Sequence, residues 1–238
     1  DFCGPELCKQ LPHIACNNNG THPPECGAYV ETSLFGYSLV DYIVNAINKK
    51  RNETAGGTHG LPKAVRMPLV KWDAELEELA ILHTKTCVFA HDKCRNTRRF
   101  KRSGQNIYKH TTGKVPTTTW LINDAMKLWY DDEIDFVNAT GIASYPLKTP
   151  GRVIGHYAQL VGERANRVGC GMTKWKENGA YEIMITCNFS SGNIAKYPVY
   201  RSGPVAGSQC KKRDKKFTNC CDADEYIDPN KVLKNGEY

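Results

Sequence analysis

The sequence predicts an α+β fold, and two observations along the chain support this prediction. Apolar residues recur at helical spacing in the first half, whereas strand-like segments appear in the second half. Helices followed by strands, without regular alternation, are typical of a mixed or sandwiched layer architecture. A third observation is the count of 11 cysteines among 238 residues, which indicates disulfides formed in an oxidising compartment. Because the count is odd, at least one sulfur has no partner within the chain.

The first element, residues 1–29, is a cysteine-dense segment with few residues that could form a core. We expect disulfides to hold it against the rest of the chain. The sequence begins with Asp1 and no charged-then-apolar leader follows, so we interpret it as the mature form of a secreted protein. The cysteines of this segment are Cys3, Cys8, Cys16 and Cys26.

Three helices are expected next. The first runs over residues 33 to about 50, where apolar residues recur at helical spacing, and Gly56-Gly57 ends it. The second begins after Trp72, with Asp73 as its N-cap. The third covers residues 117 to about 130.

The apolar pattern then changes to that of strands. Residues 168–175 and 181–189 are predicted strands, and the Lys-Glu-Asn-Gly sequence at 176–179 is a hairpin signal between them. Residues 107–108 indicate a shorter strand. The polar tail from Cys210 onward is expected to be rich in loops.

The formal net charge is +7, and much of the excess lies in two basic clusters. Such clusters favour anionic partners, namely sulfated glycans, acidic protein surfaces or anionic lipid headgroups. The alternative is that they are solvated loops that keep the protein soluble. Nucleic acid is not expected, since no zinc finger, RNP-like motif or recognition helix accompanies the charge. The first cluster is Arg95, Arg98, Arg99, Lys101 and Arg102, and the second is Lys211, Lys212, Arg213, Lys215 and Lys216.

Two further features bear on the compartment. No apolar run approaches the roughly 18 residues that a membrane span requires, so no integral membrane segment is expected. The N-x-S/T pattern marks Asn19, Asn52 and Asn138 as candidate glycosylation sites. The fourth sequon, at Asn188, follows Cys187 in a predicted strand, which argues against its use.

Six motifs in order along the chain resemble the CAP superfamily, which contains cysteine-rich secretory proteins, antigen 5 and class 1 pathogenesis-related proteins. The clearest are G-H-Y-A-Q-L-V at 155–161, V-G-C-G at 168–171 and G-Q-N-I at 104–107. The N-terminal cysteines and the lysine-rich tail are similar to the insect antigen 5 branch, and to antigen 5 proteins of fly saliva, which are often allergens.

The resemblance implies an α-β-α sandwich, with helices on both sides of a small sheet. It divides the chain into a cysteine-rich N-terminal segment packed on the main domain (1–29), a CAP domain (30–205) and a basic C-terminal extension closed by a disulfide (206–238). It also implies the disulfides Cys3–Cys16, Cys8–Cys94, Cys26–Cys87 and Cys170–Cys187.

Cys170–Cys187 has independent support, because its cysteines lie in the two strands of one predicted hairpin. Adjacent cysteines rarely bond to each other, so Cys210 takes either Cys220 or Cys221. We favour Cys210–Cys221, as in similar proteins, which leaves Cys220 unpaired. If Cys220 is exposed, we expect a disulfide-linked dimer.

Many CAP proteins place two histidines and two glutamates around a central cavity, where they can bind zinc or copper. Here the four positions fall on Ile47, Gln105, Asp132 and His156, with Glu133 next to Asp132. Only His156 is retained, since isoleucine cannot ligate a metal and glutamine is a poor ligand. We therefore expect no metal and no cofactor, and we interpret His156 as a cavity histidine hydrogen-bonded to a neighbour.

No catalytic motif supports an enzyme, because the sequence has no G-x-S-x-G elbow, H-E-x-x-H helix or P-loop. The resemblance implies a secreted, non-enzymatic, salivary protein that binds host plasma or immune proteins or anionic glycans, and so modulates haemostasis, inflammation or immunity. The Arg-Gly-Asp triplet for integrin capture is absent. The alternative is a carrier of small hydrophobic ligands such as fatty acids, eicosanoids or sterols, with the helix at 33–50 and Ile47 lining the channel.

Overall fold

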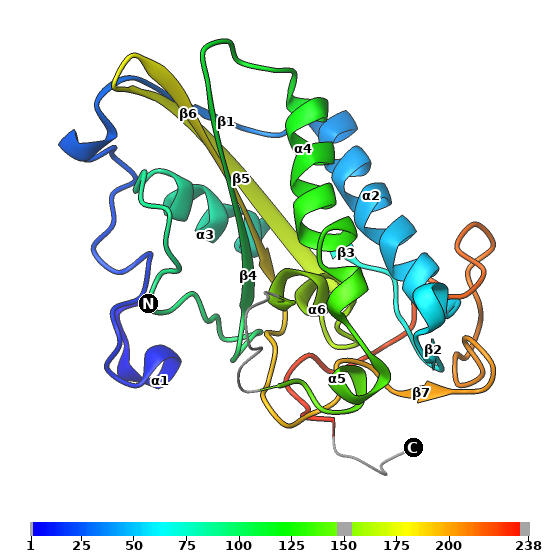
Figure 1. Cartoon of the computed structure of the whole chain (residues 1–238). Coiled ribbons are helices and arrows are strands. Elements are labelled where there is room, and N and C mark those ends of the chain that lie inside the picture. Colours follow the sequence, from blue (N-terminus) through cyan, green and yellow to red (C-terminus); the bar gives the residue numbers. More distant parts are fainter. Residues whose placement is uncertain (1, 147–153, 234–238) are drawn as a thin grey trace.

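A computed structural model describes residues 2–146 and 154–233, which form three layers (Figure 1). The middle layer is a sheet with the strand order β1-β5-β6-β4, and β3 pairs with β5 outside this path. Helix α3 packs on β5 and β6 at one face of the sheet, whereas α2, α4 and α6 lie together at the other face. The α+β class and the α-β-α sandwich are therefore confirmed.

The main sheet is antiparallel except where β3 pairs with β5. Its β5–β6 hairpin, which agrees with the prediction, turns at Asn178 and Gly179. Both residues have positive φ angles, of 50° and 82°, as a type I′ turn requires. Strand β4 is longer than the predicted strand at 107–108, and β1 is a strand that the sequence analysis missed. The strands are β1 (Ala28–Ser33), β3 (Lys71–Trp72), β4 (Gly104–Thr112), β5 (Arg167–Glu177) and β6 (Ala180–Phe189).

The three expected helices are present with their predicted end signals. Helix α2 (Tyr37–Ala55) ends at Gly56, and it begins later than predicted because Ser33 belongs to β1. Asp73 caps α3 (Ala74–Thr84), since its carboxylate accepts the backbone N–H of Leu76 at 3.2 Å. Helix α4 (Thr118–Met126) covers the first part of the third predicted helix.

The remaining elements are short. They are α1 (Pro5–Cys8), α5 (Ala139–Ala143), α6 (Gly155–Val161), 3₁₀ turns at Pro24–Cys26, Thr58–Gly60 and Ile134–Phe136, a π-helical turn at Lys127–Asp131, and the antiparallel pair β2 (Lys63–Ala64) and β7 (Ser202–Gly203). The segment 195–205 contains the short strand β7.

Two glycines of the V-G-C-G motif allow α3 to lie directly on β5. A Cβ atom on Gly169 would lie 2.1 Å from the backbone nitrogen of Glu77, and one on Gly171 would lie 2.7 Å from Cα of Ile81. No larger residue fits without moving the helix away from the sheet. The motif therefore sets the spacing between these two layers.

The main core lies between the sheet and the layer of α2, α4 and α6. Ile47 and Trp129 are buried there, with 0% and 2% exposure. Arg51 is also fully buried, and it donates to backbone carbonyl oxygens, including that of Leu160 at 2.8 Å. This hydrogen bond joins α2 to α6 in the interior of the protein.

Five disulfides are formed, and they are the pairs that the sequence analysis favours. The C-terminal tail also packs on the main core, which includes Cys220 and contacts Phe217. The division of the chain at residues 29/30 and 205/206 stays a prediction. The bonds are Cys3–Cys16, Cys8–Cys94, Cys26–Cys87, Cys170–Cys187 and Cys210–Cys221.

Candidate functional site

A groove of about 870 Å³ lies between α1 and the segment 93–102, and we call it the basic groove. Its lining includes the apolar side chains of Leu7 and Leu11. Glu6 is the only carboxylate among the lining residues. The cationic lining residues are Lys9, Lys93, Arg95, Arg98, Lys101 and Arg102.

The two walls of the basic groove are joined covalently and by hydrogen bonds. The Cys8–Cys94 disulfide links α1 to the segment 93–102. The side-chain amide of Asn96 donates to the carbonyl oxygen of Leu7 at 3.0 Å, and His13 bonds the Asn96 carbonyl oxygen at 2.8 Å. The groove is therefore fixed by long-range contacts, and the short helix α1 does not need to be stable on its own.

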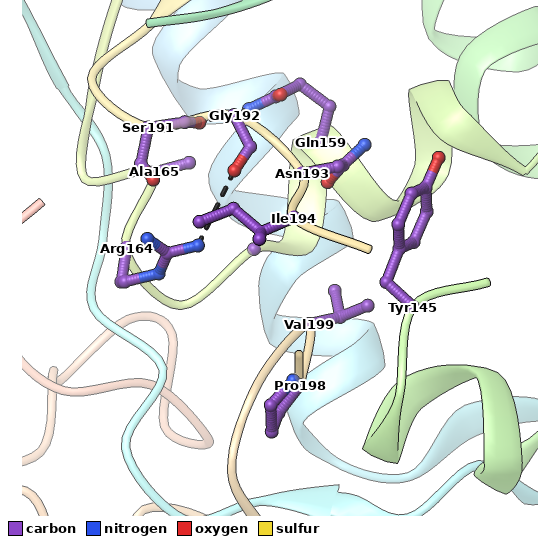
Figure 2. A pocket seen from close by; sticks show the side chains of 11 residues that line it. Tyr145, Gln159, Arg164, Ala165, Ser191, Gly192, Asn193, Ile194, Pro198 and Val199 are labelled. Atoms are coloured by element: carbon purple, nitrogen blue, oxygen red, sulfur yellow. Dashed lines mark hydrogen bonds between the residues drawn. The ribbon is translucent and has the colours of Figure 1, made fainter. Parts of the chain in front are cut away.

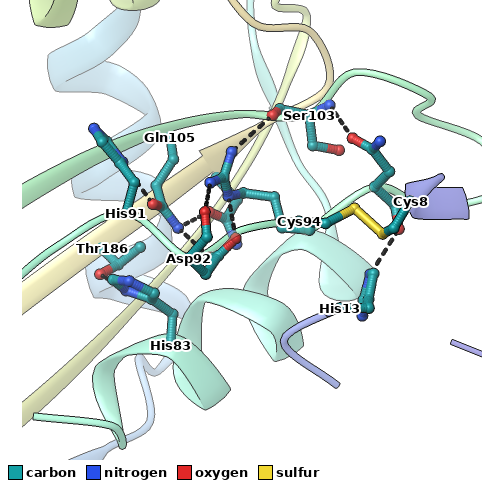
Figure 3. A network of polar contacts seen from close by, with 12 residues as sticks. Cys8, His13, His83, His91, Asp92, Cys94, Ser103, Gln105 and Thr186 are labelled. Atoms are coloured by element: carbon teal, nitrogen blue, oxygen red, sulfur yellow. Dashed lines mark hydrogen bonds and ion pairs between the residues drawn. A yellow bond between two sulfur atoms is a disulfide. The ribbon is translucent and has the colours of Figure 1, made fainter. Parts of the chain in front are cut away.

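A polar network beneath the groove holds the segment 93–102 to the sheet (Figure 3). Asp92 forms an ion pair with Arg95 at 2.9 Å, and it accepts a hydrogen bond from Gln105 at 2.8 Å. Gln105 also bonds His91 at 2.7 Å. Nearby, burial lowers the pKa of His83, which favours the neutral ring that bonds Thr186 at 2.8 Å.

Five of the lining cations have no carboxylate partner among the residues the structure describes, and their side chains are exposed. Arg95 is different, because it is half-buried and paired with Asp92. Arg99, which the sequence analysis places in the same cluster, does not line the groove. Its guanidinium pairs with Asp73 at 2.7 Å and with Glu75 at 2.9 Å. The unpaired cations are Lys9, Lys93, Arg98, Lys101 and Arg102.

Lys9 and Lys93 lie outside the two predicted basic clusters, because those clusters are defined by charge density along the chain. A signal was present, since Lys9 follows Cys8 and Lys93 precedes Cys94. The implied disulfide between these cysteines brings both lysines to the first basic cluster.

The second basic cluster is part of the structure of the tail. Arg213 donates to the carbonyl oxygen of Ala206, and Lys212 pairs with Asp222 at 3.3 Å. Lys216 donates to the side chain of Asn45 on α2 at 2.8 Å. Figure 1 places this part of the chain, in orange, on the opposite side from α1, so the two clusters do not form one surface. Lys211 and Lys215 remain exposed.

Two of the candidate family ligands come together, and the carboxylate of this pair is Glu133 rather than Asp132. The His156 Nδ1 atom lies 2.6 Å from Oε1 of Glu133, whose Oε2 accepts the backbone N–H of Tyr157 at 2.8 Å. Asp132 instead pairs with Lys127 at the surface, at 2.5 Å.

The π-helical turn explains this correction. The backbone N–H of Asp132 bonds the carbonyl oxygen of Lys127 at 2.9 Å, five residues earlier, instead of the four of an α-helix. A π-helical turn holds about one residue more than an α-helical turn. The side chains after it are shifted by about one position around the helix axis, so Glu133 faces His156. Counting residues along the sequence does not reveal this extra residue in the turn.

The other two cavity positions do not join this pair. Gly104 and Asn106 on β4 face α6, because a Cβ on Gly104 would meet Gln159 and the Asn106 amide bonds the His156 carbonyl oxygen. Gln105 therefore points to the opposite face, where it bonds His91 and Asp92.

These residues do not fit a metal of the family type. Ile47 is a core residue, and Gln105 lies in the network under the basic groove. Within the described ranges, no three His, Cys, Asp or Glu side chains come together in a group that could hold a metal ion. His156 and Glu133 alone supply too few ligands.

The expected dimer through Cys220 is not supported, because this thiol is buried. Its side chain has 0% exposure, and burial raises its pKa to about 12 against a weaker opposing effect of Arg51. A neutral, inaccessible thiol does not form intermolecular disulfides.

The sequons also differ in their surroundings. Asn19 and Asn138 are exposed. The Asn52 side chain accepts the backbone N–H of Asn219 at 2.9 Å, and Thr54 of the same sequon is fully buried. Asn188 is buried. Glycans at Asn19, Asn52 and Asn138 stay a prediction.

The lipid-channel alternative relied on the helix at 33–50. In α2, Ile43 and Ile47 are 2% and 0% exposed and belong to the main core. They pack as ordinary core residues, and the carrier hypothesis stays a prediction.

Comparisons with known proteins agree with the fold. The sequence model of the cysteine-rich secretory protein family matches residues 44–189. Tabinhibitin 4 of Tabanus yao is 34% identical over 219 residues, covering 92% of this chain and 87% of that protein. Venom allergen-1 of Aedes albopictus is 35% identical over 237 residues, covering 95% and 89%. The crystal structure of NaASP2 with Zn2+ shares the fold, with a TM-score of 0.64, 21% identity, and coverage of 87% of this chain and 100% of that one.

The chain therefore belongs to the CAP family of cysteine-rich secretory proteins. Its similarity to the insect proteins, together with the N-terminal disulfides, places it in the antigen 5 branch of that family. Among residues 2–146 and 154–233, none of the helices combines the length and the apolarity that crossing a bilayer requires.

Proposed function

We propose that this protein is a secreted, non-enzymatic antigen 5-like protein of saliva that binds anionic host partners through the basic groove. The partners are acidic plasma or immune proteins or sulfated glycans, and their capture modulates haemostasis, inflammation or immunity. Five disulfides support an oxidising, extracellular location.

The observation that carries this proposal is the set of five exposed cations around one concave surface, none of which has a carboxylate partner in the described part of the chain. Partnered cations contribute little to binding, because an anionic partner must first replace the internal carboxylate. Unpaired cations on a fixed wall attract an anionic partner without that cost. The lining includes no histidine or serine, and its two cysteines are bonded to each other, which favours binding over catalysis.

The test measures binding to immobilised heparin, as a sulfated-glycan probe, and recovery of acidic proteins from plasma. The variant Arg98→Gln/Lys101→Gln/Arg102→Gln removes three groove charges. At about 1 kcal/mol for each cation near an anionic surface, we expect the heparin affinity to fall about 100-fold. Recovery of plasma proteins should fall in parallel if they use the same groove.

The matched control is Lys211→Gln/Lys212→Gln/Lys215→Gln, which removes the same charge from the second cluster. We expect this control to bind heparin within about threefold of the wild type. Equal weakening in both variants would mean that net charge alone determines binding. If the wild type captures neither heparin nor acidic plasma proteins, the proposed function is wrong.

A further inference from the structure

A small pocket on the C-terminal side of α6 contains two buried polar groups that have no hydrogen-bond partner among the residues the structure describes. They are Nη1 of Arg164 and Oγ of Ser191, and these residues are only 6% and 3% exposed. Both line the same cavity, whose volume is about 10 Å³. Figure 2 shows the Arg164 guanidinium on the same side of the pocket as Ser191, with Tyr145 on the opposite side.

Buried donors without partners are costly, and they are rare in native proteins. Arg164 has one further bond, from Nη2 to the carbonyl oxygen of Gly192, and at 3.5 Å this bond is weak. Ser191 is held in place because the side-chain amide of Gln159 donates to its carbonyl oxygen at 2.7 Å. The two unpartnered groups therefore belong to a fixed wall.

Arg164 also has no carboxylate in direct contact within residues 2–146 and 154–233. The neighbouring carboxylate, Glu163, is fully buried and engaged by Arg201, whose Nε lies 2.9 Å from Oε1. Asp228 lines an adjacent pocket with Arg164, but the two side chains do not form an ion pair. No ion pair involving Arg164 occurs among the described residues.

Arg102 adds a second positive charge near Arg164. Burial is the main effect that lowers the pKa of Arg164, and the positive charge of Arg102 lowers it further, against a weaker opposing effect of Glu163. An isolated buried guanidinium beside a like charge is unfavourable unless a negative charge accompanies it.

The size of the cavity restricts the missing group. A volume of about 10 Å³ has room for roughly one small body, which favours a monatomic anion over sulfate, phosphate or a carboxylate. A water molecule could satisfy the hydrogen bonds, but it would leave the charge of Arg164 uncompensated. A monatomic anion satisfies both needs.

We propose that this pocket binds one halide ion, chloride in an extracellular fluid, between the guanidinium of Arg164 and the hydroxyl of Ser191. The ion accepts hydrogen bonds from both groups and neutralises the arginine. The site is separate from the basic groove and does not depend on the proposed function.

The direct test uses crystals of the full chain soaked in sodium bromide, because bromide scatters anomalously and replaces chloride. We expect one strong anomalous peak within hydrogen-bonding distance of Arg164 Nη1 and Ser191 Oγ. A pocket that contains only water, with no anomalous peak, would overturn the proposal.

A solution test compares the thermal unfolding midpoint in sodium chloride and in sodium gluconate at the same ionic strength. Because a ligand that binds only the folded state stabilises it, chloride should raise the midpoint by about 2–6 °C. Equal midpoints in the two salts would overturn the proposal, and a crystallographic peak without this shift would indicate an adventitious ion only.

Two variants and a control locate the effect. Arg164→Met removes the charge and should abolish the chloride dependence. If Arg164→Met does not fold, Ser191→Ala removes only one donor and should require a higher chloride concentration for the same shift. Lys215→Gln, at an exposed charge that does not line the pocket, should retain the dependence. An undiminished dependence in Ser191→Ala would contradict the assigned site.

Discussion

The two basic clusters are alike in sequence, yet they differ in what their charges contact. Around the basic groove, Arg98, Lys101 and Arg102 are exposed and have no carboxylate partner within the described part of the chain. In the tail, Arg213 bonds a backbone carbonyl oxygen and Lys212 pairs with Asp222. One cluster presents its charge outward on a concave wall, whereas much of the other maintains the tail itself.

This difference shows that the density of charge along a chain does not define a binding surface. The surface arises where the fold leaves cations unpaired on a fixed wall, and the Cys8–Cys94 disulfide provides that wall by adding Lys9 and Lys93. The predictions below test this contrast in decreasing order of expected effect.

The largest effect is expected when the wall is detached. The variant Cys8→Ser/Cys94→Ser removes a bond between residues 86 positions apart, and chain entropy then favours the unfolded state by about 4 kcal/mol. Urea unfolding should show this loss, and heparin affinity should fall at least about tenfold because α1 no longer faces the segment 93–102. Removing Cys3–Cys16 instead, as Cys3→Ser/Cys16→Ser, should retain the affinity. Wild-type affinity in the Cys8/Cys94 variant would show that the groove is not the site.

The second prediction concerns Cys220, which anchors the tail that carries the other cluster. Its pKa is about 12 in the folded chain, above the ordinary thiol value. The folded state therefore keeps a proton that the unfolded state loses, so stability is full below about pH 9 and falls by about 1.4 kcal/mol per pH unit as pH rises toward 12.

Between about pH 9 and 10, Cys220→Ala should lack this alkaline decrease in the free energy of unfolding. Above about pH 10 both proteins lose stability, because burial also raises the pKa of Tyr130, Tyr157 and Tyr200. In the wild type, a maleimide at neutral pH should label no thiol before unfolding and one thiol after unfolding. Rapid labelling of the native chain would contradict the buried thiol.

A smaller effect separates two adjacent arginines. Arg99→Gln loses the pairs with Asp73 and Glu75, and we expect a stability loss of about 1 kcal/mol, limited by the 54% exposure of its side chain, with unchanged heparin affinity. Arg98→Gln should leave the urea midpoint unchanged and weaken heparin binding about fivefold. If the two variants exchanged these effects, the assignment of paired and unpaired charges would be wrong.

The smallest effect is expected for exposed lysines of the tail. Lys211→Gln/Lys215→Gln should change the free energy of unfolding by less than about 0.5 kcal/mol, since neither side chain has an ion-pair partner among the described residues. Heparin binding should also remain within about twofold. A tenfold decrease would assign part of the binding to the second cluster.

Local sequence signals predicted the local structure well. The Lys-Glu-Asn-Gly hairpin, the Asp73 cap and the end of α2 at Gly56 depend on residues close in sequence, and each is present. The disulfide pairs follow from the family resemblance.

Features that depend on tertiary contacts were not predictable in the same way. Glu133 faces His156 only because of the π-helical turn, and Arg99 is paired only because α3 lies beside it. Burial of Cys220 likewise follows from how the tail packs on the core, which no local pattern specifies.

The most direct test of the central claim is hydrogen–deuterium exchange of the full chain with and without a heparin oligosaccharide. The basic groove predicts that binding slows exchange at residues 5–11 and 93–102, while exchange at residues 211–216 stays the same. Slower exchange confined to residues 211–216, or to helices α2 and α4, would contradict it.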